Sequence, residues 1–274
     1  MIVVVNDTGA ELDGTGGNDD VARAVVDEII AQGGTATAST HDVSTHSGAT
    51  SAVGVALQEY GRLDAVVNNA GMLRDRSFAK MTLGDFDAVV QTHLGGAAYV
   101  THAAWGALGE SGLGRVVFTS SASGLYGQFG QANYAAAKSA MVGLVGVLKQ
   151  EGERAGIKVN AIAPAAHTRM TERLLPHEAL DGLSPDLVSP VVGYLASDEC
   201  EVSGWILEVA AGLVARVQVT ETNTVAVVGD DGIADMDQAI STLQQQPVGS
   251  TYSTSSDALA RFVSAATATS TSTI

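Results

Sequence analysis

The chain of 274 residues is poor in cysteine, in basic residues and in long apolar stretches. Its one cysteine, Cys200, cannot form an internal disulfide, so a reducing, cytoplasmic compartment is expected. Lysine and arginine number 14 against 30 aspartates and glutamates, and the net charge of −16 argues against nucleic acid or an anionic membrane as partner. No basic leader precedes an apolar core, and no apolar run is long enough to cross a bilayer. We therefore expect a soluble protein that binds neither nucleic acid nor membrane.

Two kinds of catalytic pattern are also missing. No group of His, Cys, Asp and Glu has the spacing of metal ligands, so no metal is expected. No Gly-x-Ser-x-Gly stretch supplies a nucleophile for acyl transfer. The chain is 46% hydrophobic, which allows a sizeable core, and we expect one α/β domain with an appendage.

The most informative stretch runs from Ser120 to Lys138 and reads S-S-A-S-G-L-Y-G-Q-F-G-Q-A-N-Y-A-A-A-K. Tyr134 and Lys138 are one helical turn apart and share a helix face. A free phenol has a pKa of about 10, and a fixed ammonium beside it lowers that pKa. Ser121, expected at the end of a strand over 115–119, can hydrogen-bond a substrate oxygen. A Tyr-x-x-x-Lys pair alone also occurs on ordinary helix faces, but with Ser121 it predicts proton transfer at a C–OH or C=O oxygen.

Strands and helices are predicted to alternate along most of the chain. The expected strands cover 2–6, a segment ending at 41, 65–68, 115–119, 158–162 and 205–209. The expected helices cover 19–32, 47–60, 82–108, the segment that carries Tyr134 and Lys138, and 191–197. Residues 165–190 are expected to form a substrate loop. This alternation predicts an α/β fold with a doubly wound, Rossmann-like parallel sheet and right-handed crossovers.

The C-terminal part has a different character. Residues 213–219 and 224–228 are predicted to form a hairpin, and residues 235–243 a short helix. From residue 244 the chain is rich in Ser, Thr, Ala and Gln, which predicts a low-complexity, disordered tail with a short frayed helix at 257–266. We therefore expect a dehydrogenase-type domain over 1–213, a C-terminal extension over 214–243 and a tail over 244–274.

Three further motifs surround the tyrosine segment. They are Asn68-Asn69-Ala70-Gly71, His41-Asp42-Val43 and Asn160-Ala161-Ile162-Ala163-Pro164. With them, residues 1–213 resemble the short-chain dehydrogenase/reductase family. The stretches Val4–Asp7, Asn68–Phe78 and Arg169–Thr171 resemble most closely the dehydrogenase modules of peroxisomal multifunctional enzymes type 2 and their bacterial relatives. Those modules oxidise (3R)-hydroxyacyl-CoA with NAD.

The resemblance assigns roles to individual residues. Ser121, Tyr134 and Lys138 would be catalytic. Tyr134 and Lys138 would also bind the cofactor, Lys138 at the nicotinamide ribose. His93 stands where many members carry an asparagine that holds a water, and it is either a proton relay or a structural histidine. The remaining cofactor contacts implied are Asn69, Ala70 and Gly71 on the adenosine side, Asp42 and Val43 beside the adenine, and Pro164 with Thr168 or Thr171 by the nicotinamide.

The N-terminal segment departs from the family pattern. Members open with a strand and a Thr-Gly-x-x-x-Gly-x-Gly loop that holds the cofactor pyrophosphate. Residues 8–16 are spaced one residue too long, and Asp7, Glu11 and Asp13 would oppose a dianion. Only one strand precedes His41, where the family has two, so Ile2–Asn6 is expected to be the family's second strand. The absent first strand would leave two inner strand edges unpaired, which implies either a start assigned too late or a truncated protein.

Under this alignment Asp7 follows the second strand. An acid there hydrogen-bonds the adenosine ribose and repels a 2′-phosphate, which favours NAD over NADP. The alternative is a loop or helix-capping aspartate.

The expected function is an NAD-dependent oxidoreductase that interconverts a (3R)-hydroxyacyl-CoA and its 3-oxoacyl-CoA, as a homodimer or homotetramer. Arg74, Arg76 and Lys80 are either contacts to CoA phosphates or a solvated charged loop. The alternatives are a 3-oxoacyl thioester reductase, a steroid or other secondary-alcohol dehydrogenase, and, in a different class, a catalytically impaired remnant that only oligomerises.

Overall fold

A computed structural model of the whole chain describes all residues except 172–180, 226–227, 230–231, 234–235 and 272–274. It divides into two compact units, Met1–Arg216 and Val217–Ile274, each of which is described by itself. Within the described residues no helix is long and apolar enough to span a membrane.

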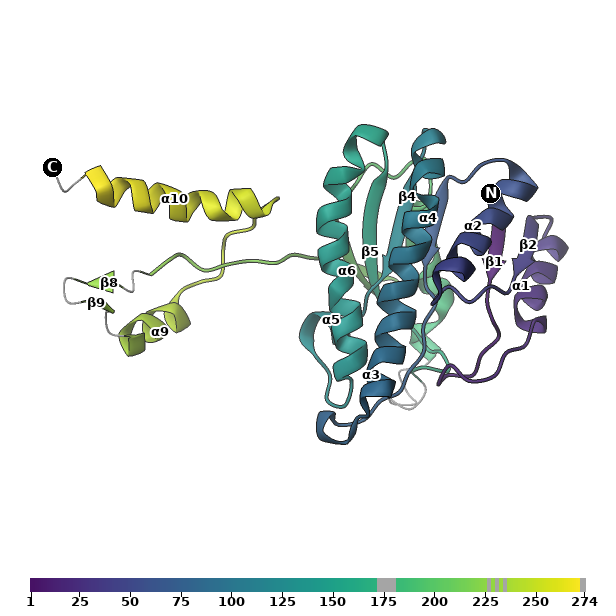
Figure 1. Cartoon of the computed structure of the whole chain (residues 1–274), viewed down its shortest axis with the longest axis horizontal. Coiled ribbons are helices and arrows are strands. Elements are labelled where there is room, and N and C mark those ends of the chain that lie inside the picture. Colours follow the sequence, from purple (N-terminus) through teal and green to yellow (C-terminus); the bar gives the residue numbers. More distant parts are fainter. Residues whose placement is uncertain (172–180, 226–227, 230–231, 234–235, 272–274) are drawn as a thin grey trace. The chain divides into compact units, whose positions relative to one another are not determined.

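The first unit is an α/β structure in which helices cover largely parallel strands (Figure 1). Its strands are β1 (Ile2–Asn6), β2 (Thr35–Ser39), β3 (Ala65–Asn68), β4 (Arg115–Thr119), β5 (Lys158–Ala165), β6 (Ile206–Ala210) and β7 (Leu213–Val217). Strands β3 to β7 form one sheet in sequence order, and β3, β4, β5 and β6 pair in parallel. The predicted α/β fold with a mostly parallel sheet is confirmed.

Strands β1 and β2 form a separate parallel pair, with Ile2 opposite Thr35 and Asn6 opposite Ser39. The prediction that Ile2–Asn6 lies beside the strand leading to His41 is therefore confirmed. Among the described residues no ladder joins this pair to the five-stranded sheet.

Most helices of this unit lie close to the positions that the sequence periodicity predicts. They are α1 (Asp20–Ala31), α2 (His46–Tyr60), α3 (Leu83–Val90), α4 (Gly96–Glu110), α5 (Ala122–Tyr126), α6 (Ala132–Glu151) and α8 (Ser189–Leu195). Short 3₁₀ turns lie at Phe78–Lys80, Glu153–Ala155, Asp181–Leu183 and Pro185–Leu187. The segment expected to be a substrate loop contains the last two of these turns, and its residues 172–180 lie outside the described part.

The sequence predicts a single helix over 82–108, whereas the structure has two α-helices there with a different helical turn between them. A π-helical turn, η2 (Gln91–Gly95), separates α3 from α4, and the backbone N–H of Gly96 donates to the carbonyl of Gln91 five residues earlier. Such turns insert one residue into a helix and are frequent at functional sites. This turn carries His93.

The core gathers around β4, whose five residues are all buried. One apolar cluster joins the sheet to α8 and the loop after it, through Val117, Ile162, Val188, Leu195, Cys200, Leu207 and Val209. Arg115, only 4% exposed, donates from its guanidinium to the carbonyls of Ser197 and Cys200. These contacts hold β4 in the core, and the active-site candidate Ser121 follows the other end of this strand.

The second unit contains a short antiparallel pair and two helices. These are β8 (Val228–Gly229), β9 (Gly232–Ile233), α9 (Met236–Gln245) and α10 (Ser255–Thr271). The helix expected at 235–243 is confirmed as α9, and α10 lies in the region predicted to be a tail. The hairpin expected between 213–219 and 224–228 is wrong, because β7 follows β6 through Ala211 and Gly212, whose φ angles of 51° and 73° suit a two-residue hairpin turn.

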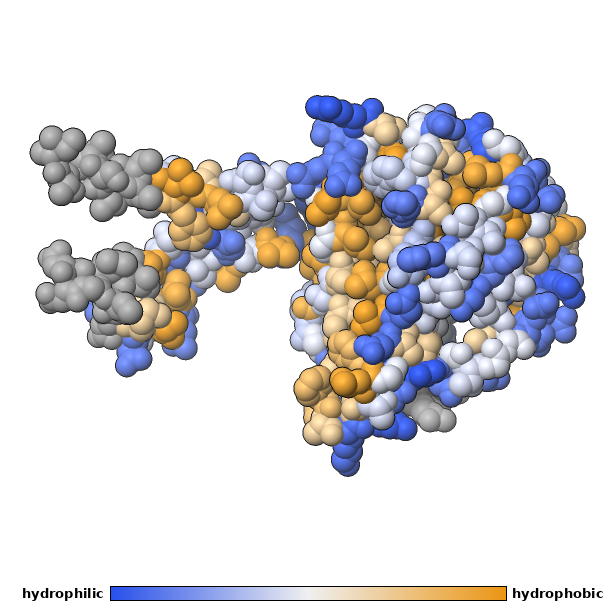
Figure 2. All heavy atoms as spheres, in the orientation of Figure 1, coloured by the Kyte–Doolittle hydropathy of each residue, from blue (hydrophilic) through white to orange (hydrophobic). Residues whose placement is uncertain are grey.

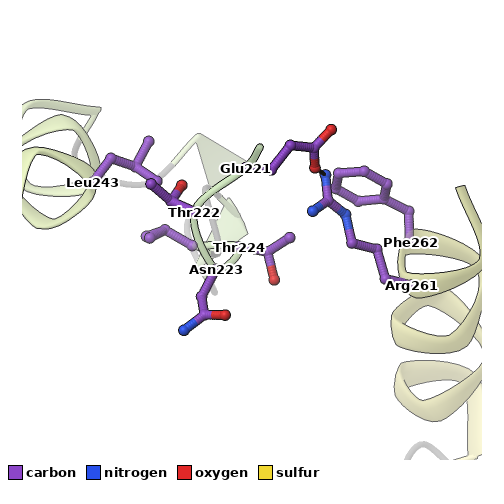
Figure 3. Close-up of a pocket in the computed structure, with 8 residues that line it drawn as sticks. Glu221, Thr222, Asn223, Thr224, Leu243, Arg261 and Phe262 are labelled. Atoms are coloured by element: carbon purple, nitrogen blue, oxygen red, sulfur yellow. Dashed lines mark ion pairs between the residues drawn. The ribbon is translucent and has the colours of Figure 1, made fainter. Parts of the chain in front are cut away.

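A pocket in this unit is lined by residues of the 221–225 segment and by Leu243, Arg261 and Phe262 (Figure 3). The Arg261 guanidinium forms an ion pair with Glu221 and lies over the ring of Phe262, 4.4 Å from its centroid. This arginine therefore has its partners within the unit.

Candidate active site

Ser121, Tyr134 and Lys138 meet where β4 ends and α6 begins. Ser121 is the N-cap of α5 and has an extended backbone, and its Oγ accepts from the Ser123 backbone N–H at 3.2 Å. The Ser121 hydroxyl is close enough to the Tyr134 phenol to lower the pKa of that phenol. The Lys138 Nζ lies 5.6 Å from the centroid of the Tyr134 ring. The structure thus brings the three residues together, as the spacing predicts.

Lys138 ties the end of β4 to α6. Its side chain is 4% exposed, and its Nζ donates to the Thr119 carbonyl at 2.6 Å. The Ser120 Oγ donates back to the Lys138 carbonyl at 2.8 Å. Burial lowers the pKa of Lys138 to about 7, because the charged form is poorly solvated. The side chain can therefore exchange a proton near neutral pH.

Tyr134 has a pKa above its ordinary value. Burial raises this pKa, the hydrogen bond with Ser121 lowers it, and the Asp75 carboxylate raises it again. The expected net lowering of this pKa is wrong for this arrangement, because burial is the largest contribution and raises the pKa. Tyr134 is consequently a protonated phenol at neutral pH, and its raised pKa makes it a weaker acid than a free phenol.

His93 packs edge-on against Tyr134, with ring centroids 5.1 Å apart. It is 3% exposed, and its Nε2 lies 2.8 Å from the carbonyl oxygen and 3.1 Å from the backbone nitrogen of Met72. Burial first, and then the charge of Lys138, lower its pKa to about 3. The imidazole is therefore neutral. Its Nδ1 is buried and has no hydrogen-bond partner among the residues that the structure describes.

Gly71 lies directly against the His93 ring. A Cβ built on Gly71 would stand 2.1 Å from the Cε1 of His93. Only glycine lets the strand end and the π-helical turn approach this closely. The glycine expected beside the cofactor thus has a clear packing role here.

The other residues expected beside the adenosine lie at the ends of β2 and β3. The Asn69 Oδ1 accepts from the Thr119 Oγ1 at 3.1 Å, and Ala70 is exposed. The Asp42 Oδ1 accepts from the Ser44 backbone N–H at 2.9 Å, which shapes the turn into α2. Val43 packs beside Gly96 of α4.

The residues expected by the nicotinamide follow a different strand. Pro164 lies in β5 opposite Val209 of β6. Thr168 lies in the turn after β5, where its backbone N–H donates to the Thr171 Oγ1 at 2.9 Å. Pro164 lies in β5, which neighbours β4, and Thr168 follows β5, so both stand towards the carboxyl ends of these strands, where Ser121 follows β4.

The loop after β1 is closed by its own hydrogen bonds. The Asp7 Oδ1 accepts from the Gly9 N–H at 2.7 Å, and the Asp13 Oδ1 accepts from the Thr15 N–H at 2.9 Å. The N–H groups of Glu11 and Gly14 donate to carbonyls of the same loop. Backbone donors engaged in this way, together with three carboxylates, do not fit a pyrophosphate.

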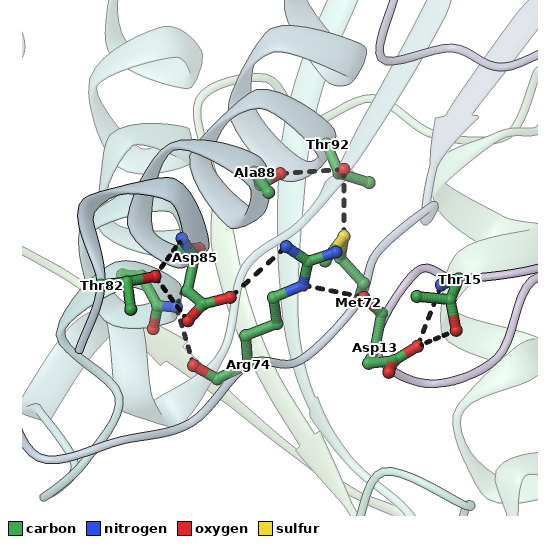
Figure 4. Close-up of polar contacts among 9 residues, drawn as sticks. Asp13, Thr15, Met72, Arg74, Thr82, Asp85, Ala88 and Thr92 are labelled. Carbon is green, nitrogen blue, oxygen red and sulfur yellow. Dashed lines mark hydrogen bonds and ion pairs between the residues drawn. The ribbon is translucent and has the colours of Figure 1, made fainter. Parts of the chain in front are cut away.

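The same loop rests on the segment after β3 (Figure 4). The Leu73 N–H donates to the Leu12 carbonyl at 2.8 Å, and the Arg74 Nε donates to the Asp13 carbonyl at 2.9 Å. Arg74 also pairs with Asp85 of α3 at 3.4 Å. Arg74, considered above for CoA phosphates, is therefore engaged within the protein.

Sequence reasoning missed a polar group next to Tyr134. The Gln131 Nε2 donates to the Asp75 Oδ2 at 2.6 Å, and the Asn133 Nδ2 donates to the Arg74 carbonyl at 3.1 Å. Both Asp75 and Gln131 stand inside the stretches that carry the resemblance, which was the only signal available. No property of the sequence places them side by side.

Comparison with known proteins agrees with this geometry. The family described as short chain dehydrogenase matches residues 5–179. A short-chain type dehydrogenase/reductase of Mycobacterium tuberculosis is 46% identical over 230 residues, which are 84% of this chain and 78% of that protein. Peroxisomal multifunctional enzyme type 2 of Mus musculus is 43% identical over 81% of this chain, but the match spans only 30% of that enzyme.

A reductase and a solved structure are also similar to this chain. An acetoacetyl-CoA reductase of Shinella zoogloeoides is 37% identical over 58% of this chain and 70% of its own length. The crystal structure of a short chain dehydrogenase from Mycobacterium avium superimposes with a TM-score of 0.75 at 37% identity, covering 91% of this chain and 88% of that one.

Proposed function

The chain belongs to the short-chain dehydrogenase family, and on that premise we propose that it interconverts a (3R)-hydroxyacyl-CoA and the 3-oxoacyl-CoA, with NAD preferred over NADP. The observation that carries the proposal is the group of Ser121, Tyr134 and Lys138 at the end of β4. The resemblance to multifunctional enzymes of type 2 supports the choice of substrate.

Ser121, Tyr134 and Lys138 each have a separate role in the proposed reaction. In the direction of reduction, the Tyr134 phenol donates its proton to the carbonyl oxygen of the substrate while the Ser121 hydroxyl holds that oxygen. In the direction of oxidation, the phenolate form of Tyr134 accepts the hydroxyl proton. A bound nicotinamide would supply the hydride for reduction and accept it in oxidation. Lys138, with a pKa of about 7, stabilises the phenolate that forms and can replace the lost proton.

The described residues fit the two ends of the dinucleotide better than its middle. Lys138, Pro164 and Thr168 would hold the nicotinamide end, and Asp7, Asp42, Val43, Asn69, Ala70 and Gly71 the adenosine end. The loop over residues 9–16 does not fit the pyrophosphate, for the reasons given above. We therefore expect weak cofactor binding by this chain, and a catalytically impaired, oligomerising protein remains the competing proposal.

The similarity to an acetoacetyl-CoA reductase supports a second candidate, a 3-oxoacyl thioester reductase working mainly in the opposite direction. A steroid or other secondary-alcohol dehydrogenase is the third. Apolar side chains gather along the face that carries α6 (Figure 2), where Val147 is 51% exposed, and this supports a homodimer or homotetramer. We place the protein in the cytoplasm on the grounds of its single, buried cysteine.

Turnover by matched variants tests the proposal. With 3-oxobutyryl-CoA and millimolar NADH, the wild type should oxidise NADH at least about 100-fold faster than Tyr134→Phe, the loss typical of a positioned acid. Tyr126→Phe is the matched control, because that tyrosine is 68% exposed on α5. Equal, background rates for the wild type and Tyr134→Phe would favour the impaired protein instead.

A further inference from the structure

His93 lies between the segment after β3 and the tyrosine of the candidate active site. Its side chain is 3% exposed, and the planes of its ring and the ring of Tyr134 stand at 88° with the centroids 5.1 Å apart. Edge-to-face pairs of aromatic rings are favourable at about 4.5–7 Å between centroids. His93 therefore touches the ring of the side chain that transfers the proton in the proposed reaction.

Backbone groups fix the position of this imidazole. The Nε2 lies 2.8 Å from the carbonyl oxygen and 3.1 Å from the backbone nitrogen of Met72. Gly71 approaches the ring so closely that a Cβ there would stand 2.1 Å from Cε1. The π-helical turn Gln91–Gly95 supplies the ring from a second segment. Because the ring cannot move without shifting one of these backbones, it is a fixed surface against which Tyr134 packs.

Packing of this kind decides where the phenol oxygen of Tyr134 lies. The oxygen is at the far end of the ring, so it moves by the largest distance when the side chain swings about its Cα–Cβ bond. His93 fills the volume beside the ring and limits that swing. A displacement of about 1 Å between reacting groups can cost about 100-fold in rate. The contact with His93 is therefore able to influence turnover without any contact to substrate.

The surroundings of the ring nitrogens argue against a proton relay through His93. A relay takes up a proton at one nitrogen and releases one from the other, so both need partners that exchange protons. The Nε2 is engaged by backbone groups of Met72, which neither take up nor release protons near neutral pH. Burial and the charge of Lys138 also lower the pKa of the ring to about 3, so the imidazolium form is scarcely populated.

Resting on the proposed function, we propose that His93 is a positioning residue, whose ring holds the phenol of Tyr134 beside Ser121 and which carries no proton. The aromatic shape of the side chain is then what the reaction needs, and its basicity is not. An aromatic ring without nitrogens should replace His93 better than a polar side chain without a ring.

Three variants separate the ring from its nitrogens. With 3-oxobutyryl-CoA and millimolar NADH, His93→Ala should lower kcat by at least about tenfold with little change in KM, because the phenol is misplaced while the contacts to the bound substrate remain. His93→Phe keeps an aromatic ring and should recover most of the loss. His93→Asn keeps polar groups without a ring and should be as slow as His93→Ala. His102→Ala, at an exposed position of α4, is the matched control and should keep the wild-type kcat.

NMR of the tyrosine ring tests the same contact without cofactor or turnover. Tyrosine labelled with carbon-13 at both Cε positions gives two signals when the ring rotates slowly and one averaged signal when it rotates fast, and the spectrum of Tyr134→Phe identifies the signals of Tyr134. The wild type and His93→Phe should show two signals, and His93→Ala and His93→Asn one. A phenyl ring is larger than an imidazole, so urea unfolding should first show that His93→Phe is folded. If it is not, β-(2-thienyl)alanine at position 93 supplies a five-membered ring without nitrogen.

The two measurements separate failure of this inference from failure of the proposed function. A folded ring variant as slow as His93→Ala would overturn the inference, and His93→Asn at the wild-type rate would show a polar role in its place. Unchanged kcat in His93→Ala, or unchanged rotation of the Tyr134 ring in that variant, would also overturn it. Slow rotation that depends on the His93 ring, in a wild type without turnover, would support the inference and refute the proposed activity.

Discussion

Gly71→Ala should destabilise the protein, and the size of the effect should depend on His93. The added Cβ would stand 2.1 Å from the His93 Cε1 and 2.8 Å from its Nδ1. The ring cannot swing away freely, because its Nε2 is held by the backbone of Met72. Overpacking of this kind costs about 1–3 kcal/mol of unfolding free energy. The backbone of Gly71 lacks a positive φ, so conformational strain adds nothing.

Urea unfolding in two backgrounds measures this coupling. In a His93→Ala background the ring is gone, and Gly71→Ala should become neutral or stabilising by about 0.4–1 kcal/mol through the reduced entropy of the unfolded chain. The double-mutant cycle should therefore give a coupling of about 1–4 kcal/mol. Gly143→Ala, on an exposed helical position with no atom near its Cβ, is the control and should stabilise in both backgrounds. The same cost for Gly71→Ala in both backgrounds would refute the role of the ring.

Three other predictions concern charge and cofactor. The pKa of Lys138, about 7 when folded against 10.5 ordinarily, means that the unfolded state binds more protons between these values. The unfolding free energy of the wild type should accordingly rise with pH relative to that of Lys138→Met, by at most about 1.4 kcal/mol per pH unit between 7 and 10. Denaturant titrations at several pH values measure this difference. The same pH dependence in the wild type and in Lys138→Met would contradict the prediction. The chain should show little thermal stabilisation even at millimolar NAD, and a clear rise in Tm at tens of micromolar would mean that residues 9–16 bind pyrophosphate after all. The kcat/KM ratio should favour NAD over NADP by about 100-fold or more, because like charges a few Å apart repel by several kcal/mol before screening. Asp7→Ala should lower that ratio. A wild-type ratio near one would mean that Asp7 only shapes the loop, through its hydrogen bond with Gly9.

The elements that the sequence predicts well are those with a strong local signal. Alternating apolar runs and helical stripes locate β1 and α1 within a residue or two, and the four-residue spacing of Tyr134 and Lys138 predicts their common helix face. The parallel pairing of β1 with β2 also follows, because a helix joins two short apolar strands.

The features that escape prediction depend on contacts between distant segments. Nothing near Gln91 marks a π-helical turn, and the residues that His93 of this turn contacts, Gly71 and Met72, lie in a distant segment. The raised pKa of Tyr134 was missed because it depends on burial and on Asp75, 59 positions away in the sequence. The prediction misplaced the hairpin after β6, because a short apolar run does not indicate which neighbouring run it pairs with.

The π-helical turn at Gln91–Gly95 also sets a limit on how the gene can vary. An α-helix advances by about 100° for each residue, so the extra residue in the turn fixes the rotational phase of α4 against α3. Removing one residue anywhere between them would turn the buried side of α4, which carries Ala97, Thr101, Ala104 and Leu108, away from the sheet. Point substitutions in this stretch alter one contact each, whereas a single-codon deletion would misalign every contact that follows.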